Sequence, residues 1–273
     1  MKPEDAQLVS QLCAARAGLK VDPEKAYLLE SRLAPVARRD GFGSIDDLIA
    51  ALRARREERL IWGVVEAMTM GETSFFRDHS PFQRFGDELL PAAARRGDGG
   101  PVRIWSAACA TGQEIYSLAM LVDGLKPHLT GARVELYASD LNERSLEKAQ
   151  SGLYTQFEVQ RGLPIRQLVR HFEKADDMWL LSPRIRQMVR WRRINLVGDL
   201  SALGQFDVIF CRYVLASLIE PMRVRVLESL AMALAPEGRL VLGDGEDATT
   251  LTPALTATGG GLYARNPDFR IAA

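Results

Sequence analysis

One stretch of the sequence, residues 102–117, limits most strongly what this chain can fold into. A largely apolar run at 102–105 predicts a buried strand. Small residues follow at 107–112, and they suit a backbone that turns sharply or lets another group approach closely. Apolar residues then recur at helical spacing from Ile115 to Val122. This succession is typical of the first half of a nucleotide-binding α/β unit, although an ordinary strand-to-helix connection has the same pattern.

An acidic residue farther along the chain favours the nucleotide-binding interpretation. A second strand is predicted at 134–139, it ends at Asp140, and Asn142 can cap the helix that follows. A carboxylate at the carboxyl end of the second strand is where such folds hold ribose hydroxyls. It suits this place because it can accept two charge-assisted hydrogen bonds from a diol. Asp140 could instead only support the start of a helix, but the small-residue turn upstream favours the ribose site.

The remaining pattern fixes the fold class. Strands are predicted at 206–211 and 239–243, with a helix at 222–234 between them, and the glycines at 259–261 separate two short strand-like pieces. We therefore expect an α/β fold with a Rossmann-like, mainly parallel sheet that ends in a C-terminal antiparallel hairpin.

The N-terminal part of the chain has a different pattern. Residues 1–78 show helical spacing without strand-like alternation, and helix starts are predicted near Asp22, Ser44 and Leu60. We expect a small all-helical domain at 1–78, followed by the α/β domain at 79–273.

The α/β pattern breaks at about 155–193, where we expect a small inserted subdomain. Between residues 161 and 193 the sequence holds nine basic and three acidic residues. Such an excess could contact an acidic partner, and the alternation at 185–191 could equally be a strand pair with one wet face.

Composition excludes several classes of function. The formal net charge is zero, so nothing demands a nucleic acid or an anionic membrane as partner. The N-terminus lacks an apolar signal core and no run approaches eighteen apolar residues, so we expect a soluble, cytoplasmic protein without membrane insertion. No C-x-x-C pairing exists, which argues against a zinc site and a disulfide framework, and we expect no metal; the three cysteines are Cys13, Cys109 and Cys211.

The available side chains also narrow the chemistry. The three histidines (His79, His128 and His171) stand in no triad or metal-ligand spacing, and the phosphate-binding pattern G-x-x-x-x-G-K-[ST] is absent. A nucleoside-binding unit without a histidine base suits a reaction that depends on positioning rather than proton transfer. Methyl transfer from a sulfonium cofactor to a carboxylate is such a reaction, because a glutamate with a pKa of about 4.3 is already ionised near neutrality.

Five motifs together carry a family resemblance. They are T-S-F-F-R-D at 73–78, W-S-A-A-C-A-T-G-Q-E-I-Y-S at 105–117, A-S-D-L-N at 138–142, S-G-L-Y at 151–154 and F-D-V-I-F-C-R at 206–212. With these motifs the chain resembles, over nearly its whole length, the chemotaxis receptor methyltransferases of the CheR type. The resemblance implies an S-adenosylmethionine-dependent O-methyltransferase, with S-adenosylhomocysteine as product, that methylates glutamate side chains of bacterial chemoreceptors.

The resemblance also implies particular site residues. Arg77 is expected to bind the cofactor's carboxylate or to steer the acceptor glutamate, and is the candidate catalytic residue. Glu114 corresponds to the acid near the methionine end of the cofactor, and Asp140 to the ribose ligand. The implied cofactor-binding set is Thr73, Arg77, Glu114, Asp140, Asn195, Leu196, Arg212 and Tyr213.

Departures from the family pattern keep alternatives open. Gly71 and Tyr213 stand where the family favours Asn, and Ser217 stands where it has Tyr. One alternative is therefore a catalytically impaired protein that binds S-adenosylmethionine or a receptor. Another, which depends only on the basic segment at 161–193, is a methyltransferase acting on RNA or a small molecule. For the leading hypothesis the expected partners are cytoplasmic chemoreceptor helices, without nucleic acid, and we expect a monomer. The insertion is short, so we do not expect it to bind a receptor tail.

Overall fold

The computed structural model describes residues 1–55, 57–96, 99–129 and 131–270, which form two compact units. The first unit consists of Met1–Met70 together with Leu215–Arg223, and the second of Gly71–Val214 and Val224–Ala273. The first division thus lies earlier in the chain than the expected boundary after residue 78. In addition, a short segment far along the sequence belongs to the N-terminal unit.

The first unit is helical, as the absence of strand alternation predicts. Its helices are α1 (Pro3–Ala17), α2 (Ala26–Arg39), α3 (Ile45–Arg55) and α4 (Glu58–Ala67). Each buries apolar side chains at helical spacing, including Val9, Cys13, Leu29, Leu33, Leu48, Leu52, Leu60 and Val64.

Two helix starts in this unit test the capping predictions. The Ser44 hydroxyl accepts the amide N–H of Asp47 at 3.1 Å, which confirms the capping arrangement ahead of α3. The start predicted at Asp22 is wrong, because α2 begins at Ala26. The Asp22 carboxylate instead accepts the N–H of Glu24 at 3.0 Å, within a turn that precedes the helix.

Residues 215–223 complete the first unit through backbone contacts. Leu19 and Leu218 form an antiparallel bridge. The N–H of Lys20 donates to the carbonyl of Ser217 at 2.7 Å, and the N–H of Ile219 donates to the carbonyl of Gly18 at 2.8 Å. Local sequence patterns cannot predict such a pairing, since its partners lie about two hundred residues apart.

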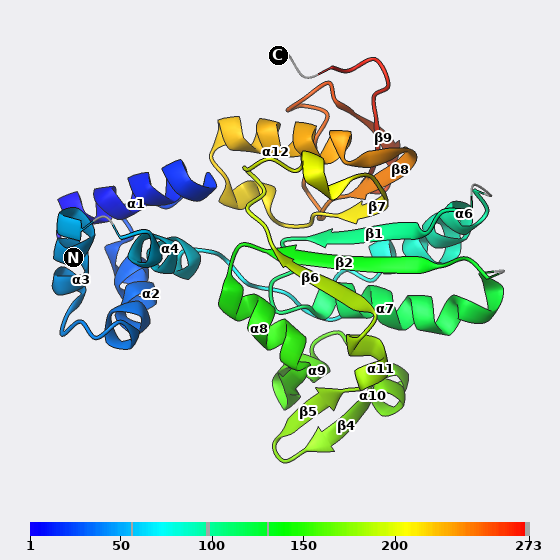
Figure 1. Ribbon diagram of the computed structural model, residues 1–273, viewed down its shortest axis with the longest axis horizontal. Helices are drawn as coiled ribbons and strands as arrows, with labels where there is room; N and C mark the ends of the chain where they lie inside the picture. The colour runs from blue at the N-terminus through cyan, green and yellow to red at the C-terminus, as the bar shows by residue number, and fades with distance from the viewer. Residues whose placement is uncertain (56, 97–98, 130, 271–273) are drawn as a thin grey trace. The chain divides into compact units, whose positions relative to one another are not determined.

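A seven-stranded sheet organises the second unit (Figure 1). The strand order is β6-β2-β1-β7-β8-β10-β9, in which the first five strands are parallel and the last two antiparallel. This confirms the mainly parallel sheet and the C-terminal hairpin. The strands are β1 (Val102–Ala107), β2 (Val134–Asp140), β6 (Val189–Arg193), β7 (Phe206–Phe210), β8 (Leu234–Val241), β9 (Leu255–Gly259) and β10 (Leu262–Arg265).

The strand order reverses between β1 and β7, because the chain builds outward through β2 and β6 and then returns to the other side of β1. In open α/β sheets, ligands bind at the carboxyl ends of the strands beside such a switch point. The residues that directly follow β1, β2, β6 and β7 therefore lie at one edge of the sheet.

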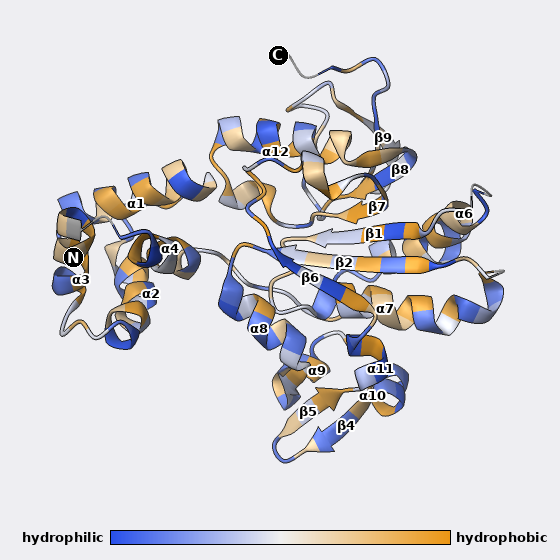
Figure 2. Cartoon of the chain, in the orientation of Figure 1, coloured by the Kyte–Doolittle hydropathy of each residue, from blue (hydrophilic) through white to orange (hydrophobic). Residues whose placement is uncertain are grey.

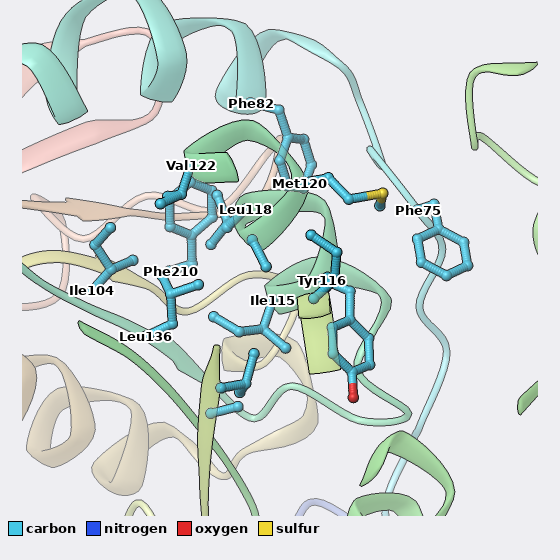
Figure 3. Packing of buried hydrophobic residues seen from close by; sticks show 14 of the residues in the cluster. Phe75, Phe82, Ile104, Ile115, Tyr116, Leu118, Met120, Val122, Leu136 and Phe210 are labelled. Carbon is cyan, nitrogen blue, oxygen red and sulfur yellow. The ribbon is translucent and has the colours of Figure 1, made fainter. Parts of the chain in front are cut away.

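Helices α7 (Gln113–Leu125) and α8 (Glu143–Ser151) pack against strands β1, β2 and β6. Figure 3 shows Ile104 of β1 and Leu136 of β2 beside Ile115, Leu118 and Val122 of α7. These side chains are almost completely buried, and they form the core that holds the sheet edge in place. Other helices of this unit include α5 (Ser80–Arg84), η1 (Phe85–Leu89), α6 (Leu90–Ala94) and α12 (Glu220–Met232), whose first residues belong to the first unit.

A small subdomain interrupts the α/β pattern, as expected. Its three antiparallel strands have the order β3-β5-β4. The elements are β3 (Leu153–Thr155), α9 (Gln156–Gln160), α10 (Ile165–His171), β4 (Phe172–Ala175), β5 (Met178–Leu181) and α11 (Pro183–Arg186). Residues 189–193, which the sequence grouped with this insertion, form β6 of the large sheet, where β6 pairs with β2 in parallel. Among the described residues, no helix has both the length and the apolar character needed to cross a bilayer.

Candidate functional site

The turn between β1 and α7 presents its backbone toward the edge of the sheet. Ala108 and Ala110 have φ values of 57° and 49°, and Gly112 has a φ of 90°. A Cβ at position 112 would lie 2.8 Å from the Cβ of Ala149 and 3.2 Å from the Trp191 ring. Glycine is therefore required here both for the left-handed backbone and for the close approach of α8 and β6.

Asp140, the last residue of β2, fixes this turn. One carboxylate oxygen accepts the N–H of Ala110 at 2.8 Å and the other accepts the N–H of Asn142 at 2.8 Å. The side-chain oxygen of Asn142 caps α8 by accepting the N–H of Ser145, so Asp140 is not the cap. Asp140 is 9% exposed, and burial raises the pKa of its carboxyl group while the backbone N–H groups oppose that rise. Each oxygen keeps a lone pair that can accept a hydroxyl of a diol.

A buried ion-pair network lies beside the turn. Glu114, in the first turn of α7, accepts the hydroxyl of Ser106 at 2.8 Å and the guanidinium of Arg212 at 3.1 Å. Arg212, which follows β7, also donates to the carbonyl of Arg77 at 2.9 Å and to the carboxylate of Asp78 at 2.5 Å. Burial raises the pKa of Glu114, and the charge of Arg212 opposes this. The network joins the carboxyl ends of β1 and β7 to the segment around Arg77.

That segment is anchored by its adjacent phenylalanines. The Phe75 ring packs against those of Tyr154 and Phe172 at centroid distances of 5.1 and 5.7 Å. Phe76 packs against Phe82 at 5.4 Å, and its N–H donates to the hydroxyl of Ser117 in α7. Both phenylalanines are buried, so this segment is not a plain connector.

Tyr213 contacts the same segment. The guanidinium carbon of Arg77 lies 3.7 Å from the centroid of the Tyr213 ring, and the Tyr213 hydroxyl donates to the carboxylate of Asp78. Tyr213 has a φ of 61°, a left-handed conformation that is uncommon for an aromatic residue. Glu246 stabilises this turn, because one of its oxygens accepts the N–H groups of Tyr213 and Gly243 at 2.7 and 2.8 Å.

The other predicted residues lie at the same edge or in the same segment. Asn195 and Leu196 follow β6 directly, and the N–H of Ile194 donates to the carbonyl of Asp140 at 3.0 Å. The Asn195 side chain accepts the N–H of Val197, and Leu196 is buried. Thr73 is half-buried, and its side chain makes no hydrogen bond to any described residue.

The structure thus joins Arg77, Glu114, Arg212 and Tyr213 in one network. Asp140 lies at the end of β2, one strand away from β1, and the pair 195–196 follows β6, two strands away. Sequence reasoning missed three residues that hold the network: Ser106, Asp78 and Glu246. Asp78 lies inside a motif that was recognised, so its position could have been noticed. Ser106 also lies inside a recognised motif, at 105–117, together with its partner Glu114. Glu246 bonds to Tyr213, thirty-three residues away in sequence, so no local pattern signals that contact.

The chemistry of these groups suits a cationic nucleoside with an amino-acid end. Asp140 can accept a ribose diol, Glu114 supplies a negative charge for an ammonium or sulfonium group, and Arg77 and Arg212 supply guanidinium groups for a carboxylate. The described part of the chain contains no cluster of three or more His, Cys, Asp or Glu residues that could hold a metal ion.

Two family models match this chain. The model described as CheR methyltransferase, SAM binding domain, matches residues 71–260, and that described as CheR methyltransferase, all-alpha domain, matches residues 4–69. The chain belongs to the CheR methyltransferase family. This confirms the family, the fold class and S-adenosylmethionine as the cofactor.

Relatives in the CheR family match most of the chain. A chemotaxis protein methyltransferase of Vibrio parahaemolyticus is 36% identical over 249 residues, which cover 89% of each chain. Chemotaxis protein methyltransferase 1 of Pseudomonas aeruginosa is 35% identical over 251 residues, which cover 90% of this chain and 91% of the relative. The Escherichia coli chemotaxis protein methyltransferase is 31% identical over 265 residues, which cover 95% of this chain and 90% of the relative.

The departures from the CheR pattern lie in different parts of the fold. Tyr213 belongs to the second unit, whereas Ser217 belongs to the first, where its carbonyl accepts the N–H of Lys20. Gly71 begins the second unit and is exposed. Tyr213 contacts the network around Arg77 and Arg212.

Proposed function

We propose that this protein transfers the methyl group of S-adenosylmethionine to glutamate side chains of bacterial chemoreceptors. The observation that carries the proposal is the joined arrangement of Asp140, Glu114 and Arg212 around the β1–α7 turn, in a chain of the CheR family. These are the groups that a nucleoside with an amino-acid end requires.

The proposed roles follow from chemistry and position. Asp140 holds the ribose diol, Asn195 and Leu196 bound the adenine side, and Glu114 lies near the methionine end. Arg212 fixes Glu114 and Asp78, while Thr73, Arg77 and Tyr213 approach from the opposite side of the turn. Arg77 binds a carboxylate, which belongs either to the cofactor or to the acceptor glutamate.

The reaction requires alignment rather than proton transfer. S-adenosylmethionine supplies an activated methyl group on a positively charged sulfur. An oxygen of the acceptor carboxylate forms a bond to the methyl carbon while the carbon–sulfur bond breaks, and the electron pair of that bond stays on sulfur. The carboxylate becomes a neutral methyl ester and the sulfonium a neutral thioether, so no proton moves. The protein's contribution is to bind, orient and exclude water, which can lower the barrier by several kcal/mol.

The proposal also includes the place where the protein acts and its oligomeric state. Acceptor glutamates on cytoplasmic chemoreceptor helices imply that the protein acts in the cytoplasm. We include a monomeric state in the proposal, and light scattering on the purified protein tests it.

Tritiated-methyl transfer tests the function. We expect label from S-adenosylmethionine to appear on receptor fragments and to be released by mild base, as a methyl ester is. Asp140→Ala should abolish most of the transfer together with binding of S-adenosylhomocysteine in calorimetry. Glu143→Ala, which removes an exposed carboxylate nearby, should change neither. Binding of S-adenosylhomocysteine without transfer to any receptor from the same cell would instead support the catalytically impaired protein.

A further inference from the structure

At strands β6, β2 and β1, the two faces of the sheet carry side chains of different character. Successive side chains of a strand point to opposite faces. Ile104, Leu136 and Trp191 belong to the apolar core with α7, so their sequence neighbours point to the other face. That other face carries the side chains of Arg103, Trp105, Glu135, Tyr137, Ser139, Arg190 and Arg192, all of which except Glu135 line a cavity.

No helix of the crossover from β6 to β7 covers this face. A parallel sheet normally has helices on both faces. Here the connection at 194–205 contains only the short 3-10 helix η3 (Ser201–Leu203). The result is a cavity of about 310 Å³, which Ile194, Ala202, Leu203 and Phe206 close from the side. Figure 2 shows β6 as mostly hydrophilic, which a strand covered on both faces would not be.

The cavity is positively charged. Three arginines line it, and none of its lining residues is acidic. Arg103 donates to the carbonyls of Gln205 and Leu203 at 2.7 and 2.9 Å, which are uncharged acceptors. Arg190 forms an ion pair at 3.4 Å with Glu135, which lies outside the lining and which Arg133 also contacts at 3.5 Å, and it donates to the Tyr137 hydroxyl at 2.9 Å.

Arg192 is the most available of the three. It is exposed, and its guanidinium makes no hydrogen bond or ion pair with any residue that the structure describes. Its five N–H donors are therefore free to bind an anionic oxygen, in the paired geometry that suits phosphate.

Aromatic side chains form the floor of the cavity. The Arg103 guanidinium lies 4.4 Å from the Phe206 ring centroid and 5.0 Å from that of Tyr137. Trp105 packs against Phe206 at 5.2 Å, and its indole N–H donates to Ser139. Aromatic rings and a guanidinium can both stack on a planar ring.

We propose that this cavity binds a small phosphate ester with a planar ring, of the class of a nucleoside monophosphate. Arg190 and Arg192 bind the phosphate, and the ring stacks on Arg103. The volume is at the lower end of small-molecule sites, which suits a mononucleotide. None of the proposed cofactor ligands lines the cavity, so the inference does not depend on the proposed methyl transfer.

Fluorescence anisotropy with N-methylanthraniloyl-GMP tests the proposal on the full chain. Saturating S-adenosylhomocysteine is present throughout, so that the nucleotide cannot report on the cofactor site. We expect saturable binding that unlabelled GMP reverses, whereas guanosine and inorganic phosphate each compete at least tenfold less well. Arg192→Glu should weaken binding at least tenfold. Arg166→Glu, which changes another exposed arginine on α10, should leave it unchanged.

A second variant controls for an indirect effect of charge. Ala202→Trp fills the cavity from η3 and should also weaken binding at least tenfold, and both variants should still bind S-adenosylhomocysteine. Absence of saturable binding, or equal effects of Arg192→Glu and Arg166→Glu, would overturn the site. If inorganic phosphate or guanosine competed as well as GMP, this would overturn the assignment of the ligand to the nucleoside monophosphates.

Discussion

At the scale of single residues, the contact between Arg77 and Tyr213 can be tested by substitution with Asn, the residue that the resemblance to the CheR type implies at position 213. The ring lies 3.7 Å from the guanidinium carbon and limits where Arg77 can point. A cation–π contact at such a site contributes about 0.5–1 kcal/mol, which corresponds to about a two- to fivefold effect. We therefore expect Tyr213→Asn to lower kcat/KM for methyl transfer about two- to fivefold, measured with labelled cofactor and a receptor fragment.

Tyr213→Phe is the matched control for that substitution. It keeps the ring over Arg77 and removes only the hydroxyl that donates to Asp78. Its kcat/KM should therefore stay closer to that of the parent than the value for Tyr213→Asn. A higher rate for Tyr213→Asn than for the parent would contradict a positioning role and would favour the view that Tyr213 impairs catalysis.

Glu114 is expected to make stability depend on pH. Burial raises the pKa of its carboxyl group, so the folded chain binds this proton more tightly than the unfolded chain does. As pH rises from the ordinary value of about 4.3 through the raised value, this group therefore lowers the free energy of unfolding. The Glu114→Gln variant has no carboxyl group at this position, so it does not lose stability in this way as pH rises. Its amide can still bond to Ser106 and Arg212.

Thermal melting at a series of pH values measures the effect. The difference in melting temperature between Glu114→Gln and the parent should move in favour of the variant as pH rises above about 4.3. A difference that stays constant between pH 4 and pH 7 would contradict the raised pKa. Glu143→Gln, at an exposed position, should show no such trend.

At the scale of elements, the β1–α7 turn depends on one glycine. Gly112→Ala places a Cβ 2.8 Å from Ala149 in a left-handed backbone, so we expect a loss of about 2–4 kcal/mol in the free energy of unfolding. Binding of S-adenosylhomocysteine should weaken with it, because the turn carries the N–H that bonds to Asp140. Chemical denaturation and calorimetry measure the two effects.

The same helix supplies the control. Gly124 lies in α7, and a Cβ there would meet nothing within 4 Å. Gly124→Ala should therefore stabilise the helix by about 0.5–1 kcal/mol and leave cofactor binding unchanged. Similar destabilisation by both substitutions would mean that α7 rejects alanine for a reason unrelated to the turn.

At the scale of the whole molecule, the small subdomain is tied to α7 by ion pairs between two exposed arginines and the buried carboxylate of Asp123. Asp123 of α7 forms ion pairs with Arg184 at 2.5 Å and Arg170 at 3.6 Å. His171 lies among them, is 1% exposed, and its ring nitrogens bond to no described residue. Burial lowers the pKa of His171, with opposition from Asp123 and support from the two arginines.

This lowered pKa predicts that the subdomain loosens in acid. The unfolded histidine binds its proton more tightly than the folded one, so stability is complete above about pH 6.5 and declines as pH falls below it. Hydrogen-exchange protection of β4 and β5, corrected for the intrinsic rate, should therefore fall between pH 7 and pH 5.5. His171→Gln should remove that fall, whereas His128→Gln, at an exposed position, should retain it. Equal protection of the parent at both pH values would contradict the prediction.

The sequence alone determined the helical character of the first unit, the main strands of the large sheet and one side of the candidate site, but not the strands of the small subdomain. Apolar periodicity is a local property, so it located β1, β2, α7 and the terminal hairpin, and it placed Asp140 at a strand end. Helix starts were predicted less reliably. The start near Ser44 was confirmed. The start at Asp22 was wrong, because a carboxylate can support a turn as readily as a helix.

Only the tertiary structure decided how distant residues meet. Glu114 and Arg212, ninety-eight residues apart, pair because β7 lies beside β1. Residues 215–223 join the helical unit, and the crossover at 194–205 places no α-helix on the face of β6, β2 and β1 opposite α7. The physical reason is that periodicity records which side of an element is buried, whereas the choice of partner depends on strand order and on packing across the whole chain.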